Sequence, residues 1–201
     1  MRKLALLTFV SLDGVMQAPG GPEEDTNAGF DLGGWTVGYF DEFLGETMGE
    51  QVGKPFAMLL GRKTYEIFAA YWPKASKEEG ADIFNNAKKY VASRTLKNVE
   101  WQNSELIEGD VVKAVEKLKE EDDPEIQVHG SSDLIQTLLE HDLVDLLHLK
   151  IFPVTLGKGK RLFGEGAIPA EFKLLKSEAS PSGVVVASYE RAGEIKHGSF
   201  G

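Results

Sequence analysis

Three stretches of this chain place small or basic residues where a strand is expected to end and a helix or loop to begin. A helix that starts directly after a strand offers free backbone N–H groups and the positive end of its dipole, and both suit an anionic group. A glycine at such a junction lets a phosphate approach the backbone closely. Three junctions in one short chain predict a single elongated polyphosphate ligand, and a dinucleotide has that shape. The junction residues are Gly61, Arg62, Lys63 and Thr64, then Ser93 and Arg94, then Gly130, Ser131 and Ser132.

Each junction also has a purely structural interpretation. Gly61 to Glu66 reads equally well as a plain strand-to-helix turn with solvated basic residues. Arg94 is either a surface arginine or a clamp on a 2′-phosphate, for which its planar, permanently charged fork is suited. Gly130 stands alone where a G-x-G-x-x-G fingerprint needs three glycines, so a standard Rossmann domain is not supported. Ser131 or Ser132 is also a candidate N-cap for the helix that follows.

The composition bounds the class of protein. The chain has 201 residues, of which 42% are hydrophobic, and this favours one domain with a sizeable core. It has no cysteine, which excludes disulfide scaffolds and thiolate metal sites, and its 4 histidines lack ligand spacing, so no metal is expected. A net charge of -10 disfavours nucleic acid as a partner. No segment approaches the roughly 20 apolar residues of a membrane span, so a cytoplasmic protein without a membrane partner is expected.

Hydrophobic periodicity and turn residues predict strands that alternate with helices up to about residue 153, followed by two strands without a helix. That order predicts an α/β fold with one domain over 1–193, a mostly parallel central sheet with helices on both faces, an antiparallel C-terminal hairpin, and a tail over 194–201. Asp13–Gly34 is expected to be a long functional loop. The expected strands are Leu4–Leu12, Pro55–Leu60, Lys89–Ala92, Glu125–His129, Leu146–Pro153, Phe172–Ser177 and Val184–Glu190, and the expected helices are Phe40–Val52, Lys63–Ala70, Ala81–Lys88, Val111–Glu121 (capped by Asp110) and Asp133–His141.

Several motifs, taken in order, resemble a known superfamily. They are Ser11–Gly14, Gly33–Trp35, Gly61–Glu66, Gly130–Ser132 with Leu134, and a run from Leu143 through Pro153–Gly159 to Phe163. In this order they are similar to the dihydrofolate-reductase-like superfamily, in the branch of the riboflavin-biosynthesis reductase domain, which is the C-terminal domain of a bifunctional deaminase-reductase. The resemblance covers nearly the whole chain.

The resemblance implies an NADPH-dependent reductase, similar to 5-amino-6-(5-phosphoribosylamino)uracil reductase, that acts on a small molecule as a homodimer. By motif match it assigns the cofactor phosphates to Gly61, Arg62, Lys63 and Thr64, the 2′-phosphate to Ser93 and Arg94, and the pyrophosphate to Gly130, Ser131 and Ser132 with Leu134. It places Val15 and Met16 in a loop over the nicotinamide.

The substrate side is less well specified by the sequence. Asp13 is the best match to a polar residue facing the substrate, and Trp35 either packs or lines the pocket. Folate reductases carry a carboxylate on the helix that here spans Phe40–Val52, but its expected inner stripe presents Thr47 instead. Asp13 and Thr47 are therefore the candidate catalytic residues, and Asp13, Trp35 and Thr47 are the candidate substrate-binding residues. A true dihydrofolate reductase is disfavoured.

Two other classes of function remain open at this point. A non-catalytic module that binds NADPH or another nucleotide, as a scaffold or sensor, would need the same junctions but no substrate. An oligomeric structural protein would use the fold for assembly alone and would bind no cofactor.

Overall fold

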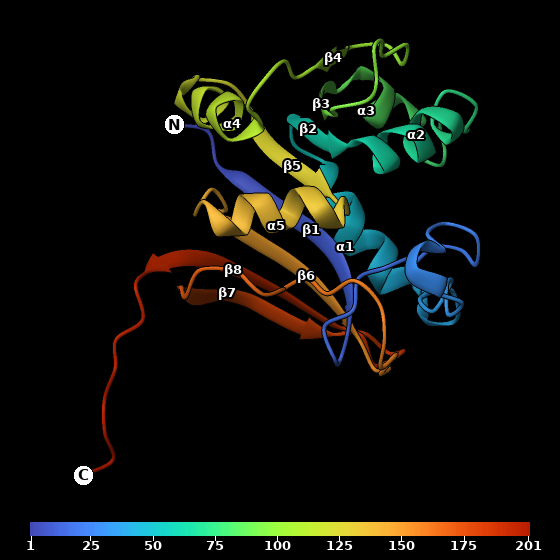
Figure 1. Ribbon diagram of the computed structural model, residues 1–201. Helices are drawn as coiled ribbons and strands as arrows, with labels where there is room; N and C mark the ends of the chain where they lie inside the picture. The colour runs from blue at the N-terminus through green and yellow to red at the C-terminus, as the bar shows by residue number, and fades with distance from the viewer.

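The computed structural model describes residues 1–201 and contains one eight-stranded sheet (Figure 1). The strands are β1 Leu4–Ser11, β2 Phe56–Gly61, β3 Lys88–Ala92, β4 Ser104–Leu106, β5 Glu125–His129, β6 Leu146–Phe152, β7 Glu171–Ala179 and β8 Val185–Gly193. The helices are α1 Glu42–Val52, α2 Arg62–Tyr71, α3 Ala81–Asn86, α4 Val111–Glu120 and α5 Ser132–Glu140, with 3-10 turns η1 Asn27–Gly29 and η2 Val37–Tyr39.

The strand order is β4-β3-β2-β5-β1-β6-β8-β7. The neighbours from β4 to β6 pair in parallel, whereas β8 runs antiparallel to β6 and to β7. The predicted α/β fold with a mostly parallel sheet and an antiparallel C-terminal hairpin is thus confirmed. Because β3, β2, β5 and β1 run parallel to one another, their carboxyl ends meet at one edge of the sheet, where open α/β sheets bind ligands.

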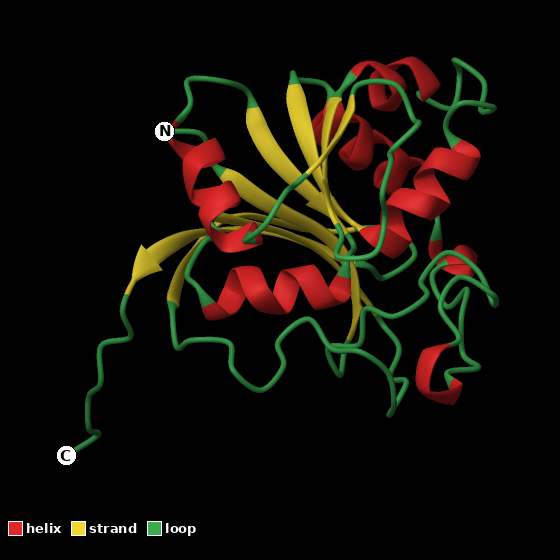
Figure 2. Cartoon of the chain, turned by 45° about the horizontal axis from the view of Figure 1, so that its top comes forward, coloured by secondary structure: helices red, strands yellow, loops and turns green.

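Alternate residues of β2 show why helices cover both faces of the sheet. Ala57 and Leu59 belong to the large core beneath α4 and α5, whereas Met58 and Leu60 pack with Tyr65 of α2 on the opposite face. A strand buried on both faces must be apolar throughout, and β2 is Phe-Ala-Met-Leu-Leu before its final glycine. Helix α1 shares the α2 face further along the sheet, and Figure 2 shows helices on both sides of the strands.

The structure departs from the sequence prediction at one edge strand and at the ends of two helices. Helix α1 begins at Glu42 and not at Phe40, and α3 ends at Asn86 and not at Lys88. Strand β4 was not expected, because its sequence Ser-Glu-Leu is short and mostly polar, and it forms only by pairing with β3 at the sheet edge.

Asp110 caps α4 as expected, since its side chain accepts hydrogen bonds from the N–H groups of Val112 and Lys113. Residues 194–201 contain no helix or strand and run away from the sheet (Figure 1). No helix has the length and apolar character needed to cross a membrane.

Candidate functional site

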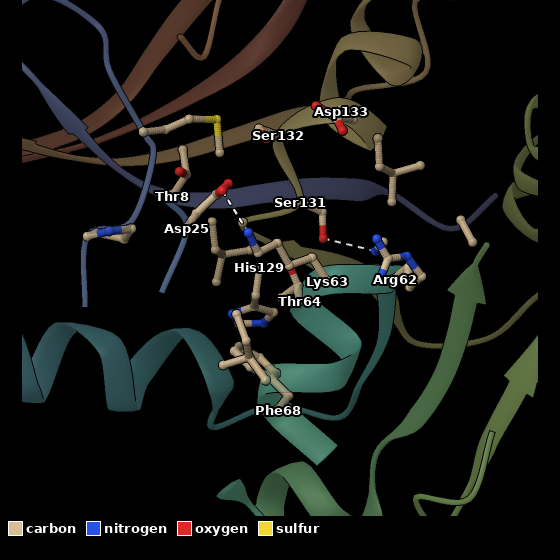
Figure 3. Close-up of a pocket in the computed structure, with 18 of the residues that line it drawn as sticks. Thr8, Asp25, Arg62, Lys63, Thr64, Phe68, His129, Ser131, Ser132 and Asp133 are labelled. Carbon is tan, nitrogen blue, oxygen red and sulfur yellow. Dashed lines mark hydrogen bonds and ion pairs between the residues drawn. The ribbon is translucent and has the colours of Figure 1, made fainter. Parts of the chain in front are cut away.

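One cavity of about 1250 Å³ opens at the carboxyl edge of the sheet, and all three strand-end junctions line it. Its wall includes strand ends from β3 at Ala92 to β6 at Lys150. Four strand spacings separate these two strands, so the cavity extends roughly 19 Å across the sheet. That length suits an elongated ligand. Figure 3 shows residues of two junctions gathered around it. The junction residues that line it are Gly61, Arg62, Lys63, Thr64, Ser93, Arg94, Gly130, Ser131 and Ser132, joined by Leu134 and Met16.

Helices α2 and α5 begin at this cavity without a side-chain cap. In contrast, Asp41 caps α1 and Asp110 caps α4. The expected capping of α5 by Ser131 or Ser132 is wrong: Ser131 occupies the N-cap position in a left-handed conformation, φ 70°, and its Oγ accepts a hydrogen bond from the backbone N–H of Gly61 at 2.9 Å instead. The first-turn N–H groups of both helices are therefore open to an anion from outside the protein.

Gly61 makes this arrangement possible through its lack of a side chain. A Cβ at this position would lie 3.3 Å from the Cβ of Ser131 and 3.4 Å from its Oγ, which is tighter than ordinary packing. The two junctions, from adjacent strands β2 and β5, can approach each other because one of them is glycine.

The third junction holds a cation with no partner in the protein. Arg94 is exposed and forms no hydrogen bond or ion pair, whereas Arg62 pairs with Glu66 one turn along α2 at 2.9 Å. The Oγ of Ser93 accepts from the N–H groups of Thr95 and Leu96, which orders the turn that presents Arg94. Its hydroxyl also lies 3.5 Å from Thr95 Oγ1, a long contact that a closer acceptor on a ligand would replace.

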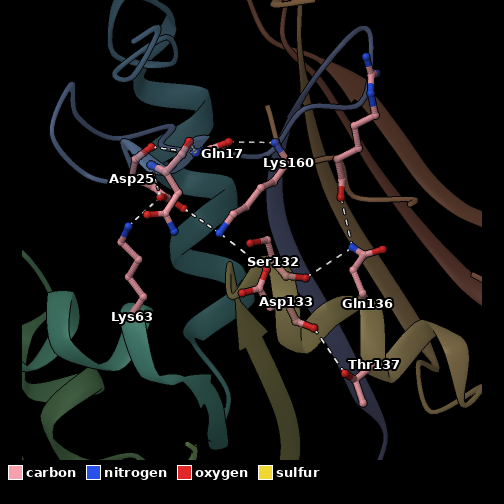
Figure 4. A network of polar contacts seen from close by, with 10 residues as sticks. Gln17, Asp25, Lys63, Ser132, Asp133, Gln136, Thr137 and Lys160 are labelled. Atoms are coloured by element: carbon pink, nitrogen blue, oxygen red, sulfur yellow. Dashed lines mark hydrogen bonds and ion pairs between the residues drawn. The ribbon is translucent and has the colours of Figure 1, made fainter. Parts of the chain in front are cut away.

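A second group of charges joins the long loop after β1 to the helices (Figure 4). The buried carboxylate of Asp25 accepts from Lys63 Nζ at 2.7 Å and lies 3.2 Å from Lys160 Nζ, which is in turn 3.7 Å from Asp133. Burial would raise the pKa of Asp25, but the hydrogen bonds from Lys63, from the N–H of Asn27 and from Lys160 outweigh it and lower the pKa. Lys63 is therefore held by the loop, and Asp25, missed in the sequence, fastens that loop at the cavity wall.

The loop itself is ordered by Gln17, another residue that carried no sequence signal. Its side-chain amide donates to the carbonyl oxygens of Asp25 and Asn27, and its Oε1 accepts from the N–H of Lys160. Its side chain is nearly fully buried and satisfied entirely by backbone groups from two loops. An isolated glutamine in a polar loop gives no hint of such a role, because its partners are distant in sequence.

Beyond the junctions, the cavity continues between the sheet and α1. Its walls there are mostly apolar and include Phe9 of β1 and Met48 and Val52 of α1. Gly45 and Gly49 stand on the same side of α1, where an added Cβ would meet no atom within 4 Å. This open, apolar chamber has the character of a small-molecule site.

Lys150 lies at the floor of this chamber and is 3% exposed. Its Nζ donates a hydrogen bond to Gln51 Oε1 of α1, and no carboxylate lies within ion-pair distance. Burial lowers the pKa of Lys150 from 10.5 to about 7, because the charged form loses its hydration. The signal for this residue was present in the sequence, since a lysine interrupts the otherwise apolar strand end Leu149–Phe152.

His129, at the end of β5, also lines the chamber in its neutral form. Burial, aided by the nearby charge of Lys150, lowers its pKa to about 3. Its Nε2 lies 3.1 Å from Oε1 of Gln127, whose amide nitrogen donates to the backbone oxygen of Gln51. The amide oxygen can only accept, so we assign the proton of His129 to Nε2.

The residues expected on the substrate side do not line the cavity. Asp13 instead accepts hydrogen bonds from the Ser11 hydroxyl and from the N–H groups of Leu156 and Gly157, and these lower its pKa to about 2. It therefore fastens two loops together. Val15, expected over the nicotinamide, is buried in an isolated β-bridge with Arg161 and does not line the cavity either.

Thr47 and Trp35 are likewise occupied by packing. Thr47 is half-buried outside the cavity, because α1 turns Gly45, Met48 and Gly49 toward the open space while Leu44 packs into the core. The predicted inner stripe holds at Phe43, Leu44 and Met48, whereas Thr47 lies at its margin. Trp35 packs edge-on against Phe152 at 5.4 Å and donates its Nε1 hydrogen to the oxygen of Gln17, so its packing interpretation holds.

A family model described as the RibD C-terminal domain matches residues 2–186. The chain belongs to this family. It is 30% identical over 192 residues to the uncharacterized protein YyaP of Bacillus subtilis (strain 168), covering 94% of each chain. It is 26% identical over 171 residues to the uncharacterized protein YwjB of the same organism, covering 82% of this chain and 84% of that one.

Solved structures of the same fold include a putative riboflavin biosynthesis protein from Shewanella sp. PV-4, with a TM-score of 0.67, 21% identity, and 96% and 99% of the two chains covered. A pyrimidine reductase-like protein from Corynebacterium diphtheriae gives a TM-score of 0.65, 14% identity, and 96% and 93% coverage. The match to a deaminase/5-amino-6-(5-phosphoribosylamino)uracil reductase from Thermotoga maritima has a TM-score of 0.62 and 16% identity, and it covers 95% of this chain and 57% of that one. The expected dihydrofolate-reductase-like, RibD-type fold is confirmed.

The buried ammonium of Lys150 makes the stability of the protein depend on pH. Its folded-state pKa of about 7 lies below the ordinary 10.5, so the unfolded chain binds more protons between these values. Above pH 10.5 the amine is neutral in both the folded and the unfolded chain, so its burial carries no charge penalty. The free energy of unfolding then falls as the pH is lowered from 10.5 toward 7. We expect Lys150→Met to unfold at higher urea concentration than the wild type at pH 7, by an amount on the order of 5 kcal/mol at most. The advantage shrinks as the pH is raised to 10.

The control is Lys117→Met, because Lys117 is exposed on α4 and does not line the cavity. That variant gains no stability over the wild type as the pH falls. A difference between Lys150→Met and wild type that stays constant from pH 6 to 10 would contradict the assignment of a buried, titrating amine.

Proposed function

We propose that this protein is an NADPH-dependent reductase that transfers a hydride to a small heterocycle or to an imine or carbonyl carbon. One observation carries the proposal: three strand-end junctions, two of them with uncapped helix starts and the third with the unpartnered Arg94, line a single elongated cavity. The family supports a reductase related to riboflavin biosynthesis, and the matched Thermotoga maritima structure is named as a uracil-derivative reductase.

The residues present fit a phosphorylated dinucleotide. The pyrophosphate is assigned to the open N–H groups at the starts of α2 and α5, with Arg62 beside them. The 2′-phosphate is assigned to Arg94 with the hydroxyl of Ser93. When bound, NADPH supplies the hydride; the protein orients the reactants and keeps water away. Met16 and the Asp25-fastened loop are placed to exclude water from this side of the cavity.

The chamber beside α1 favours catalysis over a scaffold or sensor. A module that only binds a nucleotide needs no second, apolar compartment continuous with the nucleotide site. Here the compartment is built from β1, α1 and β6, and it ends at a buried amine. We assign the substrate to this chamber.

The choice of cofactor is tested at Arg94. Only NADPH carries a 2′-phosphate, and the loss of a charged hydrogen bond costs roughly 1.5–3 kcal/mol. Arg94→Ala is therefore expected to weaken NADPH binding by about tenfold to 150-fold and to leave NADH binding nearly unchanged, as measured by calorimetric titration.

The matched control is Lys97→Ala, a nearby exposed cation that does not line the cavity and is expected to change neither affinity. Equal losses for NADPH and NADH in Arg94→Ala would mean that Arg94 does not contact this phosphate. Failure of the wild type to bind either dinucleotide would refute the proposed function.

Dihydrofolate is expected to be a poor substrate. A pterin ring needs a carboxylate to pair with its N3 and 2-amino groups, and the part of α1 that faces the chamber presents Gly45, Met48 and Gly49. Asp13, the other candidate, is held by loop N–H groups outside the cavity. Steady-state assays with NADPH should give negligible turnover. A kcat on the order of 1–10³ s⁻¹ would overturn this expectation.

We also propose a homodimer. Strand β7 is an edge strand with little of its surface buried, and Leu174 and Leu175 on it are 49% and 50% exposed. An edge strand that exposes two leucines can pair with a second chain. Light scattering at micromolar concentration is expected to give twice the 22.1 kDa monomer mass. Leu174→Glu should shift the protein to the monomer, and a wild-type monomer would remove the proposal.

A further inference from the structure

Two lysines are almost completely buried in this protein, and they are satisfied very differently. Lys89 donates its hydrogen bonds to the carbonyl oxygens of Asn85, Ala87 and Gln102, at 2.8, 2.8 and 3.0 Å. Its Nζ also lies 4.1 Å from the centre of the Trp101 ring. Because an ammonium has three N–H donors, Lys89 is complete within the protein. It does not line the cavity, and its role is structural.

Lys150 is left incomplete by its surroundings. Its Nζ has one hydrogen-bond partner, Gln51, and lies 5.9 Å from the ring of Phe9, with no carboxylate within ion-pair distance. Two of its donors have no partner in the protein, although the side chain lies at the cavity floor. Buried donors without partners are costly, so this position is built for an acceptor that enters with a ligand.

A second donor in the same cavity has no partner. The Nε1 hydrogen of Trp72 is buried and forms no hydrogen bond, and the indole ring is stacked on Phe84 at 4.0 Å. Both aromatic residues line the cavity. The two histidines that feel the charge of Lys150, His129 and His148, are both neutral because burial lowers the pKa of each. The cavity thus combines aromatic walls with unsatisfied donors, and at the Lys150 end it offers a ligand an amine without a counter-ion.

We propose that Lys150 binds the substrate directly and selects a planar heterocycle that presents an anionic or strongly accepting ring oxygen. This inference deepens the proposed reductase function, on which it rests, by fixing the polarity of the substrate. A ring that presents amino groups at this point would place donor against donor and leave all of them unpaired. An ammonium there also stabilises the negative charge that develops on the oxygen or nitrogen bonded to the carbon that receives the hydride.

Two pyrimidines of the same size test this selectivity. Barbituric acid is an oxygen-bearing anion at neutral pH, and 2,4-diaminopyrimidine presents amino groups. Calorimetric titration is carried out with the full chain, with and without NADPH, for the wild type, Lys150→Met and the exposed control Lys117→Met. We expect the wild type and Lys117→Met to bind barbiturate at least about tenfold more tightly than Lys150→Met does, and to bind 2,4-diaminopyrimidine no more tightly than Lys150→Met does.

Several results would overturn the proposal. They are equal binding of barbiturate by the wild type and Lys150→Met, no binding of barbiturate by the wild type, and a wild-type preference for the diamino ring. If Lys150→Met does not fold, Lys150→Gln replaces it and is held to the same expectation. The NADPH titration without a pyrimidine is read separately. If NADPH does not bind in that titration, the proposed reductase function is contradicted. If NADPH binds but the wild type and Lys150→Met bind barbiturate equally, only the inference about Lys150 is contradicted.

Discussion

The hydrogen bond from the backbone of Gly61 to the hydroxyl of Ser131 is the contact on which the proposed nucleotide site depends. It joins the ends of β2 and β5, which are neighbours only because β5 is inserted between β2 and β1. It also diverts the one side chain at the N-cap position of α5 away from its own helix. Two helix starts are therefore left open side by side, and an anion can satisfy both of them at once.

The cations that line the cavity differ in whether the protein supplies them with a counter-ion. The chain carries a net charge of -10, and five cations line the cavity from β3 to β6 alongside six carboxylates. Asp25 pairs with both Lys63 and Lys160, and these contacts fasten the loop. Arg94 and Lys150 are left without counter-ions near the two ends of the cavity, in very different surroundings. Arg94 is solvated and suits a phosphate, whereas Lys150 is desolvated and suits a group that is itself removed from water.

The sequence was sufficient to predict the parts of the candidate site whose residues are adjacent in the chain. The junctions at Gly61 and Gly130 could be recognised because a strand, a turn and a helix start each leave a local pattern. The sequence was insufficient where the outcome depends on how elements rotate and pack. Asp13 and Thr47 have suitable side chains, but loop N–H groups bind the first and the rotation of α1 turns the second away from the cavity. Asp25 acquires its role only through partners distant in sequence, and the lysine at position 150 is visible in an apolar strand end, but its burial depends on how α1 packs beside it.

The most direct test of this account is amide hydrogen exchange, measured residue by residue by NMR, with and without saturating NADPH. The account predicts slower exchange on NADPH binding in the first turns of α2 and α5, from Arg62 to Thr64 and from Ser132 to Leu134, since phosphate oxygens would accept from those N–H groups. Exchange in the β7–β8 hairpin should not change. Unchanged exchange at both helix starts while NADPH is bound would contradict the central claim, because the cofactor would then be held somewhere else.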